Sequence, residues 1–522
     1  MKAITRIKLQ NFKRFRDFEI AMDEKLNILV GENESGKSSI LTAISLVLSG
    51  SRSQVQKIGI ERLLNSQVTE EFLASEKKYE DLPFMYVELW LNEQNNFELR
   101  GKNNSENVEC DGLSMMCAPI EALSEEIKEI LASDDINFPF EYYAVTFSTF
   151  QGDQYTGYKK YLKYIVIDTS LISNDYAIRE YIGGMYENYV EGPEKHKHQN
   201  EYRKSKKYFK DTALAELNER VEGYSFSVKN DVKTNLRTDL TIVENNIDID
   251  NKGKGKQCFI KTEFALRRAE NPASKIDVAL IEEPENHLSH INMKKLIEMI
   301  GNSDDKQLII ATHSNMISAR LDLRKTIFLN SISQNPLLLS GLPEDTARFF
   351  MKAPNHGVLD FVLSNKVILV EGDAEFMLME DFFQVVAGRS MESADVHVIS
   401  VGGTSFKRYL DIACILSVKV AVIRDNDKNY NANSVEPYGD YQGENISIFS
   451  DTDNERYTFE VCMYADNKDV CDQLFAEGRR TLSIQDYMLN NKTESAFSLL
   501  EHGVDNLEAP QYIRDAIEWI NA

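Results

Sequence analysis

The sequence predicts an α/β protein with two domains, each built on a parallel sheet. Its 522 residues exceed what one ordinary hydrophobic core organises, so two or three domains are expected. Near the N-terminus an apolar strand, a glycine-bounded loop and an apolar-periodic helix follow one another, and a second alternation of strands and helices begins after the middle of the chain. These patterns predict a first domain over 1–345, a linker over 346–363 and a second domain over 364–522.

The composition limits the setting in which the protein works. Hydrophobic residues make up 42% of the chain and charged residues 27%, which is typical of a soluble globular protein. No apolar run approaches the roughly 20 residues that span a bilayer, and the N-terminal residues lack a signal-peptide pattern. The six cysteines are scattered, which suits a reducing compartment. We therefore expect a cytoplasmic protein with no membrane attachment.

The net charge of −24 bears on possible partners. A protein that coats DNA is normally basic, so a chain this acidic would contact DNA only through local basic patches and metal ions. The charge by itself identifies no partner, because acidic residues also keep a surface soluble.

The first domain contains two segments that interrupt its α/β pattern. Residues 51–150 mix short strand patterns with polar loops and are expected to form a β-rich insertion. Residues 151–222 become polar and helix-prone, and they are expected to form a helical arm.

A phosphate-binding loop is the clearest motif of the first domain. Residues from Gly31 to Ser38 satisfy GxxxxGK[ST], between the strand and the helix that this motif requires. Backbone N–H groups of such a loop point at phosphates, Lys37 would reach the β and γ oxygens, and Ser38 would bind Mg²⁺. The nucleotide-binding candidates here are Gly31, Asn33, Gly36, Lys37, Ser38 and Ser39.

Two later strands end in residues that suit ATP hydrolysis. The apolar strand of IDVALIEEPE ends in Glu282, which would contact the Mg²⁺ shell, and Glu283, which would position or deprotonate the attacking water. His313 ends the next strand, QLIIATHS, where it could sense the γ-phosphate.

The spacing of these motifs resembles that of ABC-type ATPases. About 240 residues separate the loop from the acidic strand, as in RecF and SMC relatives with an insertion between the lobes. In that group ATP is closed between two heads, so the resemblance implies a homodimer or tetramer through the head. The segment Gly253-Lys-Gly255-Lys-Gln257 resembles the signature loop that one head offers the other, although the usual Ser-Gly-Gly is missing and a flexible basic loop is an alternative. Glu282 stands where most ABC proteins have Asp, which implies slow hydrolysis.

The second domain places acidic residues at the ends of two strands. Glu371 ends an apolar strand before a glycine turn, and Asp425 and Asp427 follow the strand VAVI. Because the carboxyl ends of parallel strands meet at one crevice, we expect the three carboxylates to converge. Hard oxygen ligands of this kind suit Mg²⁺ or Mn²⁺, which organise phosphodiester chemistry.

This Glu and DxD pattern resembles a TOPRIM domain, the metal-binding module of topoisomerases, primases and OLD-family nucleases. An ABC-type head followed by TOPRIM resembles the overcoming lysogenisation defect (OLD) family, and the resemblance covers essentially the whole chain. It implies two metal ions, with further ligands at Glu375 and Glu460, and a lysine, Lys492, that stabilises charge on the scissile phosphate. It also implies that the helical arm takes part in dimerisation.

The densest basic run of the chain lies at residues 194–210. This run contains seven Lys or Arg residues and only two acids, Glu194 and Glu201. The aromatic residues Tyr202, Tyr208 and Phe209 lie between the cations. The cations could contact phosphates and the rings could stack on bases. A solvated helical face is an equal alternative.

The leading hypothesis is an ATP-regulated DNA endonuclease that uses ATP and Mg²⁺ or Mn²⁺ and acts on duplex DNA. The resemblance implies a bacterial anti-phage role, with a partner such as a helicase or a retron reverse transcriptase with its DNA. The rival hypothesis is a non-cleaving ATP-dependent sensor or scaffold whose acids bind Mg²⁺ structurally. A topoisomerase is disfavoured because no strand-passage domain is recognisable, and a primase is disfavoured by the ATPase head.

Overall fold

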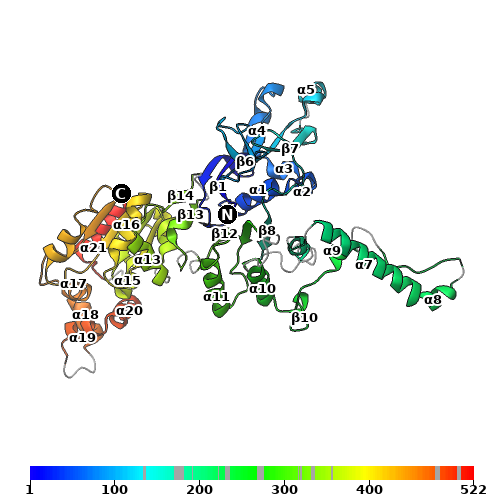
Figure 1. Ribbon diagram of the computed structural model, residues 1–522. Coiled ribbons are helices and arrows are strands. Elements are labelled where there is room, and N and C mark those ends of the chain that lie inside the picture. The colour runs from blue at the N-terminus through cyan, green and yellow to red at the C-terminus, as the bar shows by residue number, and fades with distance from the viewer. Residues whose placement is uncertain are drawn as a thin grey trace. The chain divides into compact units, whose positions relative to one another are not determined.

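The computed structural model describes residues 1–132, 137–169, 182–187, 189–190, 192–221, 223–229, 235–266, 276–314, 317, 320–330, 335–353, 357–476, 482–502 and 507–522. The chain divides into two compact units: Met1–Ser314 with Leu329–Pro336, and Asn315–Phe328 with Leu337–Ala522. Each unit contains sheets and helices of its own, so the expected two-domain α/β organisation is observed (Figure 1).

An antiparallel sheet forms one layer of the first unit. Its order is β2-β1-β4-β6-β5, and β7 also pairs with β6. The strands are β1 (Ile4–Phe12), β2 (Phe15–Ala21), β4 (Met85–Leu91), β5 (Arg100–Gly101), β6 (Cys110–Pro119) and β7 (Tyr143–Thr149). The strands expected within 51–150 therefore join the sheet that β1 and β2 begin. Helices α2 (Arg52–Ile58), α3 (Ile60–Leu63) and α4 (Ser66–Ala74) precede β4, and α5 (Ser124–Leu131) precedes β7.

A parallel layer carries the expected nucleotide motifs. Its strands run in the order β3-β12-β11-β8, and each neighbouring pair is parallel. They are β3 (Leu26–Gly31), β8 (Tyr164–Asp168), β11 (Val278–Glu282) and β12 (Gln307–Thr312). Strands β11 and β12 are almost wholly buried, as expected for a parallel sheet covered on both faces. Helix α1 (Lys37–Ser49) packs against strands of both sheets.

The expected helical arm, 151–222, is only partly helical: α7 (Gly192–Thr212) and α8 (Ala215–Glu219) lie in it, but residues 164–168 form strand β8 of the parallel layer. This unit also contains α9 (Leu236–Asp239), α10 (Lys254–Leu266) and α11 (His290–Gly301), with a short hairpin of β9 (Val243–Glu244) and β10 (Ile247–Asp248). Helix α9 lies beside α7, and α8 follows its C-terminal end (Figure 1).

The second unit holds a four-stranded parallel sheet in the order β16-β15-β17-β18. Its strands are β15 (Lys366–Val370), β16 (Val396–Ser400), β17 (Lys419–Ile423) and β18 (Ile446–Phe449), and the first two helices between them are α15 (Asp373–Ala387) and α16 (Phe406–Leu416). The expected alternation of strands and helices is confirmed in this unit. The later helices are α17 (Phe459–Asp466), α18 (Lys468–Phe475), α19 (Ile484–Asn490), α20 (Lys492–His502) and α21 (Gln511–Asn521).

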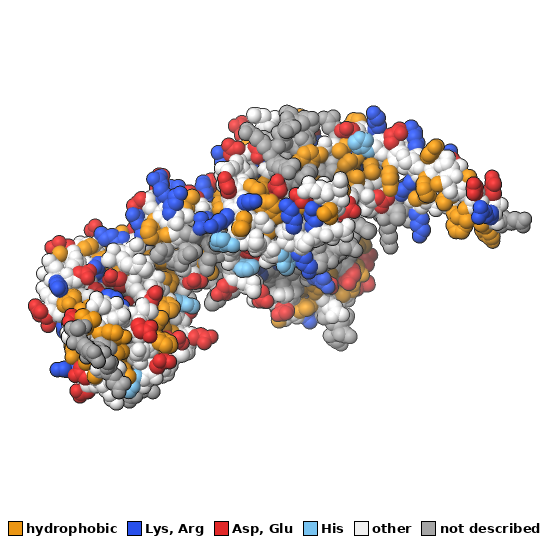
Figure 2. All heavy atoms as spheres, turned by 90° about the horizontal axis from the view of Figure 1, so that it is seen from below, with side chains coloured by type: hydrophobic (Ala, Val, Ile, Leu, Met, Phe, Trp, Pro, Cys, Tyr) orange, Lys and Arg blue, Asp and Glu red, His pale blue; other side chains and the backbone are white. Residues whose placement is uncertain are grey.

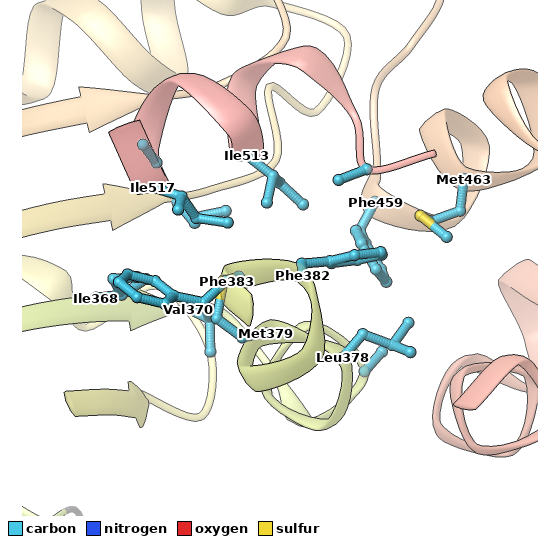
Figure 3. Close-up of a cluster of buried hydrophobic side chains, with 14 of the residues drawn as sticks. Ile368, Val370, Leu378, Met379, Phe382, Phe383, Phe459, Met463, Ile513 and Ile517 are labelled. Carbon is cyan, nitrogen blue, oxygen red and sulfur yellow. The ribbon is translucent and has the colours of Figure 1, made fainter. Parts of the chain in front are cut away.

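A core of buried apolar side chains joins this sheet to its helices. Ile368 and Val370 of β15 meet Phe382 and Phe383 of α15, with Ile513 of α21 above them (Figure 3). Phe459 and Met463 of α17 reach the same cluster. The N-terminal end of α17 is thereby held against α15, which matters for the site described below.

The segment expected as a linker, 346–363, differs from that expectation. Helices α13 (Glu344–Lys352) and α14 (Val358–Leu363) occupy most of it, after an antiparallel pair of β13 (Thr326–Leu329) and β14 (Leu337–Leu338). The division between the compact units falls earlier, near residue 314. The prolines and weak periodicity that suggested a linker belong to short helices with buried faces. No helix in the described ranges has the length and apolar character needed to cross a membrane.

Candidate nucleotide and metal sites

The phosphate-binding loop has the geometry that its motif predicts. It joins β3 to α1, and Lys37 folds back so that its Nζ donates to the carbonyls of Gly31 at 2.7 Å and Glu32 at 2.8 Å. Gly36 has a φ of 100°, which favours glycine, and a Cβ there would lie 2.4 Å from the Phe15 ring. Asn33 is exposed within the loop, and Ser39 is half-buried in the first turn of α1.

Glu282 lies at the end of β11 beside this loop. The Ser38 hydroxyl donates to Glu282 Oε1, which joins the two predicted Mg²⁺-binding positions directly. Burial raises the pKa of Glu282, and the nearby Asp168 adds to the rise while Lys13 and Lys37 oppose it. Burial in turn lowers the pKa of Lys37. The strand order explains the contact, because β12 alone separates β3 from β11.

Glu283 and His313 also meet, as their positions at neighbouring strand ends predict. His313 Nδ1 contacts Glu283 Oε2 and lies 3.6 Å from Glu285 Oε1. Burial, and then the hydrogen bond and charge of Glu285, raise the pKa of Glu283 to about 7. Glu285 was missed by the sequence analysis, although it accepts hydrogen bonds from Thr312 Oγ1 at 2.5 Å and from the His313 N–H at 3.2 Å. The sequence signal that could have indicated Glu285 is its place as the third acid of the segment EEPE, two residues after Glu283.

The suggested signature segment begins helix α10. Gly255 lies in its first turn, where a Cβ would be 2.0 Å from the His287 carbonyl oxygen, so only glycine fits there. Gly253 precedes the helix, and Gln257 is buried with its amide donating to the Lys252 carbonyl at 2.7 Å. The segment is therefore an ordered helix start rather than a flexible loop, and the Gln257 side chain is turned toward its own loop.

The acids of the second unit converge where the strand order reverses. The chain passes from β15 to β16 on one side and then to β17 on the other, which opens a crevice beyond the carboxyl ends of β15 and β17. Glu371 follows β15, and Asp425 and Asp427 follow β17. Glu375 lies in the first turn of α15, and Glu460 in the first turn of α17.

The environment of these acids disfavours their charged forms. Glu375, Asp425 and Glu460 are each at most 6% exposed. Burial, followed by the charges of Glu460 and Glu371, raises the pKa of Glu375 to about 7. Burial, followed by the charges of Glu375, Glu371 and Glu460, raises the pKa of Asp425 well above its usual value. Mutual electrostatic effects among four of the five acids indicate that they share one site.

Lys492 lies in the same cluster. Its Nζ is 3.1 Å from Glu460 Oε2, although 32 residues separate the two in sequence. Burial opposes the charged form of Lys492, but Glu460, Asp425 and Glu375 together raise its pKa. The structure thus brings Lys492 to the acids.

A hydrogen-bonded loop holds the aspartates in place. Asp425 Oδ1 accepts the Phe459 N–H at 2.8 Å, which joins the end of β17 to the start of α17. Asn426, between the two aspartates, donates to the carbonyls of Asp451 at 2.8 Å and Asp453 at 2.9 Å. Arg456 anchors the same loop by hydrogen bonds to Asp451 and Asp466, each with a contact of 2.6 Å.

Arg424 is a second residue that the sequence analysis missed. It is 7% exposed, its Nη1 donates to the Tyr438 hydroxyl at 3.1 Å, and its Nη2 lies 3.5 Å from Asp427 Oδ2. Burial and then the charge of Asp427 raise the pKa of Glu371, and Arg424 opposes this rise. The residue precedes the DxD directly, but its burial was not evident from sequence because Arg is rarely buried without a partner.

The donor set fits divalent cations. Among the described residues, the buried Oε2 of Glu371 accepts no hydrogen bond, and the buried Oε2 of Glu460 has the ion pair with Lys492 and no hydrogen bond besides. Buried carboxylate oxygens without donors are costly, and a divalent cation would satisfy several of them together. Oxygen ligands without His or Cys favour Mg²⁺ or Mn²⁺.

Comparison with known proteins agrees with this architecture. Residues 362–427 match the family model of the overcoming lysogenization defect protein-like TOPRIM domain, and residues 1–79 match that of an AAA ATPase domain.

Several solved structures are similar to parts of the chain. The RecF–ATP structure of the RecFOR pathway has 11% identity and a TM-score of 0.36, covering 63% of this chain and 98% of its own. An Smc head bound to the C-terminal domain of ScpA, from Pyrococcus furiosus, has 14% identity and a TM-score of 0.34, covering 65% and 98%. The C-terminal region of the Burkholderia pseudomallei OLD protein has 20% identity and a TM-score of 0.26, covering 30% and 96%.

The fold and the matched domains define an ABC-type ATPase head joined to a TOPRIM domain. This order, an ATPase domain followed by an OLD-like TOPRIM domain, is similar to that of the OLD family of ATPase–nucleases.

Proposed function

We propose that this protein is an ATP-regulated, divalent-metal-dependent DNA endonuclease. The single observation that supports it most strongly is the 3.1 Å contact of Lys492 with Glu460, inside a cluster of buried acids. A structural ion site needs carboxylates alone, whereas a lysine beside them supplies the positive charge that phosphodiester cleavage requires. This favours cleavage over the rival function of a non-cleaving scaffold.

Within this proposal the acids hold Mg²⁺ or Mn²⁺ through Glu371, Glu375, Asp425, Asp427 and Glu460. When bound, these ions would polarise the phosphate and lower the pKa of a coordinated water. Lys492 is about half exposed, so its ammonium can turn from Glu460 toward a phosphate oxygen. Arg424 stays behind Asp427 and orients it. The loop held by Asn426 and Arg456 fixes the position of Glu460 relative to Asp425.

The ATPase site would regulate this chemistry. Lys37 contacts backbone carbonyls that phosphates would replace as its partners, and Ser38 and Glu282 already form the pair that would share Mg²⁺. Glu283 would orient the attacking water, and its contact with His313 would change when a γ-phosphate binds. The segment from Gly253 to Gln257 would approach the ATP of a second head, and hydrolysis would be slow.

We propose that the protein assembles as a homodimer or tetramer through its ATPase head, with the arm contributing. Large apolar side chains are exposed beyond the end of α7, as expected for a surface that another copy covers: Leu217 is 42% exposed, Tyr224 83% and Phe226 54%. Hydrophobic side chains are visible toward this tip, at the right of Figure 2.

The biological setting is proposed from the family resemblance. We propose a cytoplasmic effector of bacterial anti-phage defence that acts on duplex DNA. A co-encoded helicase, or a retron reverse transcriptase with its DNA, would be its partner.

The decisive experiment is cleavage of supercoiled plasmid with Mg²⁺ or Mn²⁺, with and without ATP. We expect the wild type to nick or linearise the plasmid and Asp425→Ala to leave it intact. Lys37→Ala shows whether ATP promotes or restrains cutting. If the wild type is inactive on plasmid, on phage DNA and with the co-encoded partner, the scaffold function replaces the nuclease.

A further inference from the structure

Helix α7 concentrates positive charge in an acidic protein. Its 21 residues contain seven Lys or Arg and three Asp or Glu, whereas the whole chain carries a net charge of −24. Lys and Arg side chains stand out along the outline of this arm at the right of Figure 2. The structure separates these cations into two groups.

One group packs the helix onto its neighbours. Lys195 Nζ lies 2.7 Å from Glu187, and Lys206 Nζ lies 3.5 Å from Asp239 of α9. The Tyr202 hydroxyl donates to Asp239 Oδ2 at 2.5 Å. Lys195, Tyr202 and Lys206 are seven and four positions apart, so they lie on one half-buried face of the helix. The Tyr202 hydroxyl is thereby held on this face, and the Lys206 ammonium lies 4.6 Å from the centre of the Tyr202 ring.

The other group faces away from those neighbours. Arg203, Lys207 and Lys210 are four and three residues apart, so they lie on one side of the helix. None of the three has an ion pair or a hydrogen bond from its side chain to any residue that the structure describes. Arg203 and Lys207 are exposed and Lys210 is half-buried. Lys204 lies beside them, with Glu201 as its partner at 2.7 Å.

We propose that this outer face of α7 binds the phosphate backbone of duplex DNA. The inference rests on the proposed nuclease function, because it supplies the positive surface that an acidic DNA-cutting protein requires. At a rise of about 1.5 Å per residue, the three cations span roughly 10 Å along the helix. That length corresponds to about three steps between successive phosphates of one strand, at about 3.4 Å each along the duplex axis. Such contacts position DNA without reading its sequence.

An acidic surface of a second copy is the competing occupant, because the chain is acidic elsewhere. The two occupants differ in a measurable way. Phosphate contacts release counterions from DNA, so each one adds about 0.9 to the slope of log affinity against log salt. Contacts between two copies would change the oligomeric state instead.

The test compares the full-length wild type with Arg203→Ala/Lys207→Ala/Lys210→Ala. Binding to a labelled random-sequence duplex is measured at several salt concentrations in EDTA, where metal-dependent cleavage cannot occur. We expect the triple variant to lower the salt slope by about 2 to 3 and to weaken binding at low salt. Alanine is the best helix former, so α7 is expected to remain folded.

The matched control is Lys25→Ala/Lys57→Ala/Lys102→Ala, which removes the same charge from exposed positions elsewhere on the ATPase unit. It should keep the wild-type slope. An unchanged slope in the α7 variant, or absence of salt-dependent duplex binding by the wild type, overturns the proposal. An unchanged slope with an altered sedimentation coefficient assigns the face to a second copy. If the α7 variant has a reduced salt slope but the wild type never cleaves DNA, the DNA-binding role of α7 is supported and only the proposed nuclease function is refuted.

Discussion

The two candidate sites of this chain are built in different ways. In the ATPase site most groups come from one loop and from the ends of two strands, and each cation or hydroxyl meets a partner: Lys37 its loop carbonyls, Ser38 the acid Glu282, and His313 the acid Glu283. In the TOPRIM site the acids come from three separate segments, 371–375, 425–427 and the start of α17. Lys492 is paired with Glu460 there, but the buried Oε2 of Glu371 accepts no hydrogen bond within the described chain.

The difference shows how each site depends on its ligand. In the ATPase site the cations are paired with acids or carbonyls, and like charges meet at Glu283 and Glu285, where burial and then Glu285 raise the pKa of Glu283 to about 7. The TOPRIM site buries like charges close together, which costs free energy until protons or divalent cations neutralise them.

The largest effect is expected at Asp425, a buried acid whose pKa burial and the neighbouring acids raise well above its usual value. Asp425→Asn should abolish plasmid cleavage and leave ATP binding unchanged, while Lys37→Ala should lose ATP binding and keep metal binding. Because the substitution removes one of several like charges, the melting temperature of metal-free Asp425→Asn should equal or exceed that of the wild type. Nucleotide-binding assays measure the ATP binding of each variant, and thermal unfolding in EDTA measures the melting temperature of the metal-free protein. A clear fall in melting temperature would contradict the account of buried repulsion.

Lys492 should come next. Lys492→Ala should slow cleavage on the order of 10²- to 10³-fold, because the charge that develops on the scissile phosphate loses its positive partner. Single-turnover cleavage rates at saturating Mn²⁺ measure this loss. Lys492→Arg is the conservative variant, and it should recover part of the rate because it keeps the positive charge. Equal rates for wild type and Lys492→Ala would favour the scaffold function.

The loop that orients the acids should matter less than the acids themselves. Asn426→Ala or Arg456→Ala should weaken metal binding by roughly 10- to 100-fold, since both residues act only through the ligands that they position. Mn²⁺ titration by calorimetry measures the affinity, and excess Mn²⁺ should restore cleavage. The control is Arg514→Ala, which removes a surface ion pair with Glu508 at 2.9 Å and should leave metal affinity unchanged.

The smallest effect concerns pH. The pKa of Glu375 is about 7, whereas a free Glu titrates near about 4.3. Between these values the folded protein retains a proton that the unfolded chain has lost. This contribution to stability is therefore complete below about pH 4.3 and is lost as the pH rises through about 7.

A divalent cation needs the ionised carboxylate, so it should reverse that loss. Mn²⁺ should raise the melting temperature more at about pH 8 than at about pH 6, with proton release on binding. Glu375→Gln should flatten this dependence. Glu283→Gln, whose parent carboxyl also has a pKa of about 7, should not, because it lies in the ATPase site. The same pH dependence in Glu375→Gln as in the wild type would contradict the assignment.

Much of the fold and of both sites could be predicted from the sequence, because their signals are local. The glycine-bounded loop, the acidic strand end and the DxD all follow apolar strands, and strand ends of a parallel sheet converge by construction. The resemblance to a known family added Glu375, Glu460 and Lys492, and the structure brings these residues together. The segment 346–363 misled the prediction, because short helices with a narrow buried face give little periodicity.

Sequence patterns alone predict two α/β units, their order, and the chemical types of the groups at each strand end. Which of these charges are buried, and which partners they meet, depends on how the elements pack in the folded chain. Several contacts of the two sites exist only because separate elements pack together. Examples are Glu285 with His313, Arg424 with Asp427, and the loop held by Asn426 and Arg456. Helix α7 is another example. Its basic run is continuous in sequence, but the fold pairs some of its cations with acids and leaves others on the outer face. The sequence specifies which residues are charged. The burial of these charges and the distances between them, which set their interaction energies, depend on the folded chain.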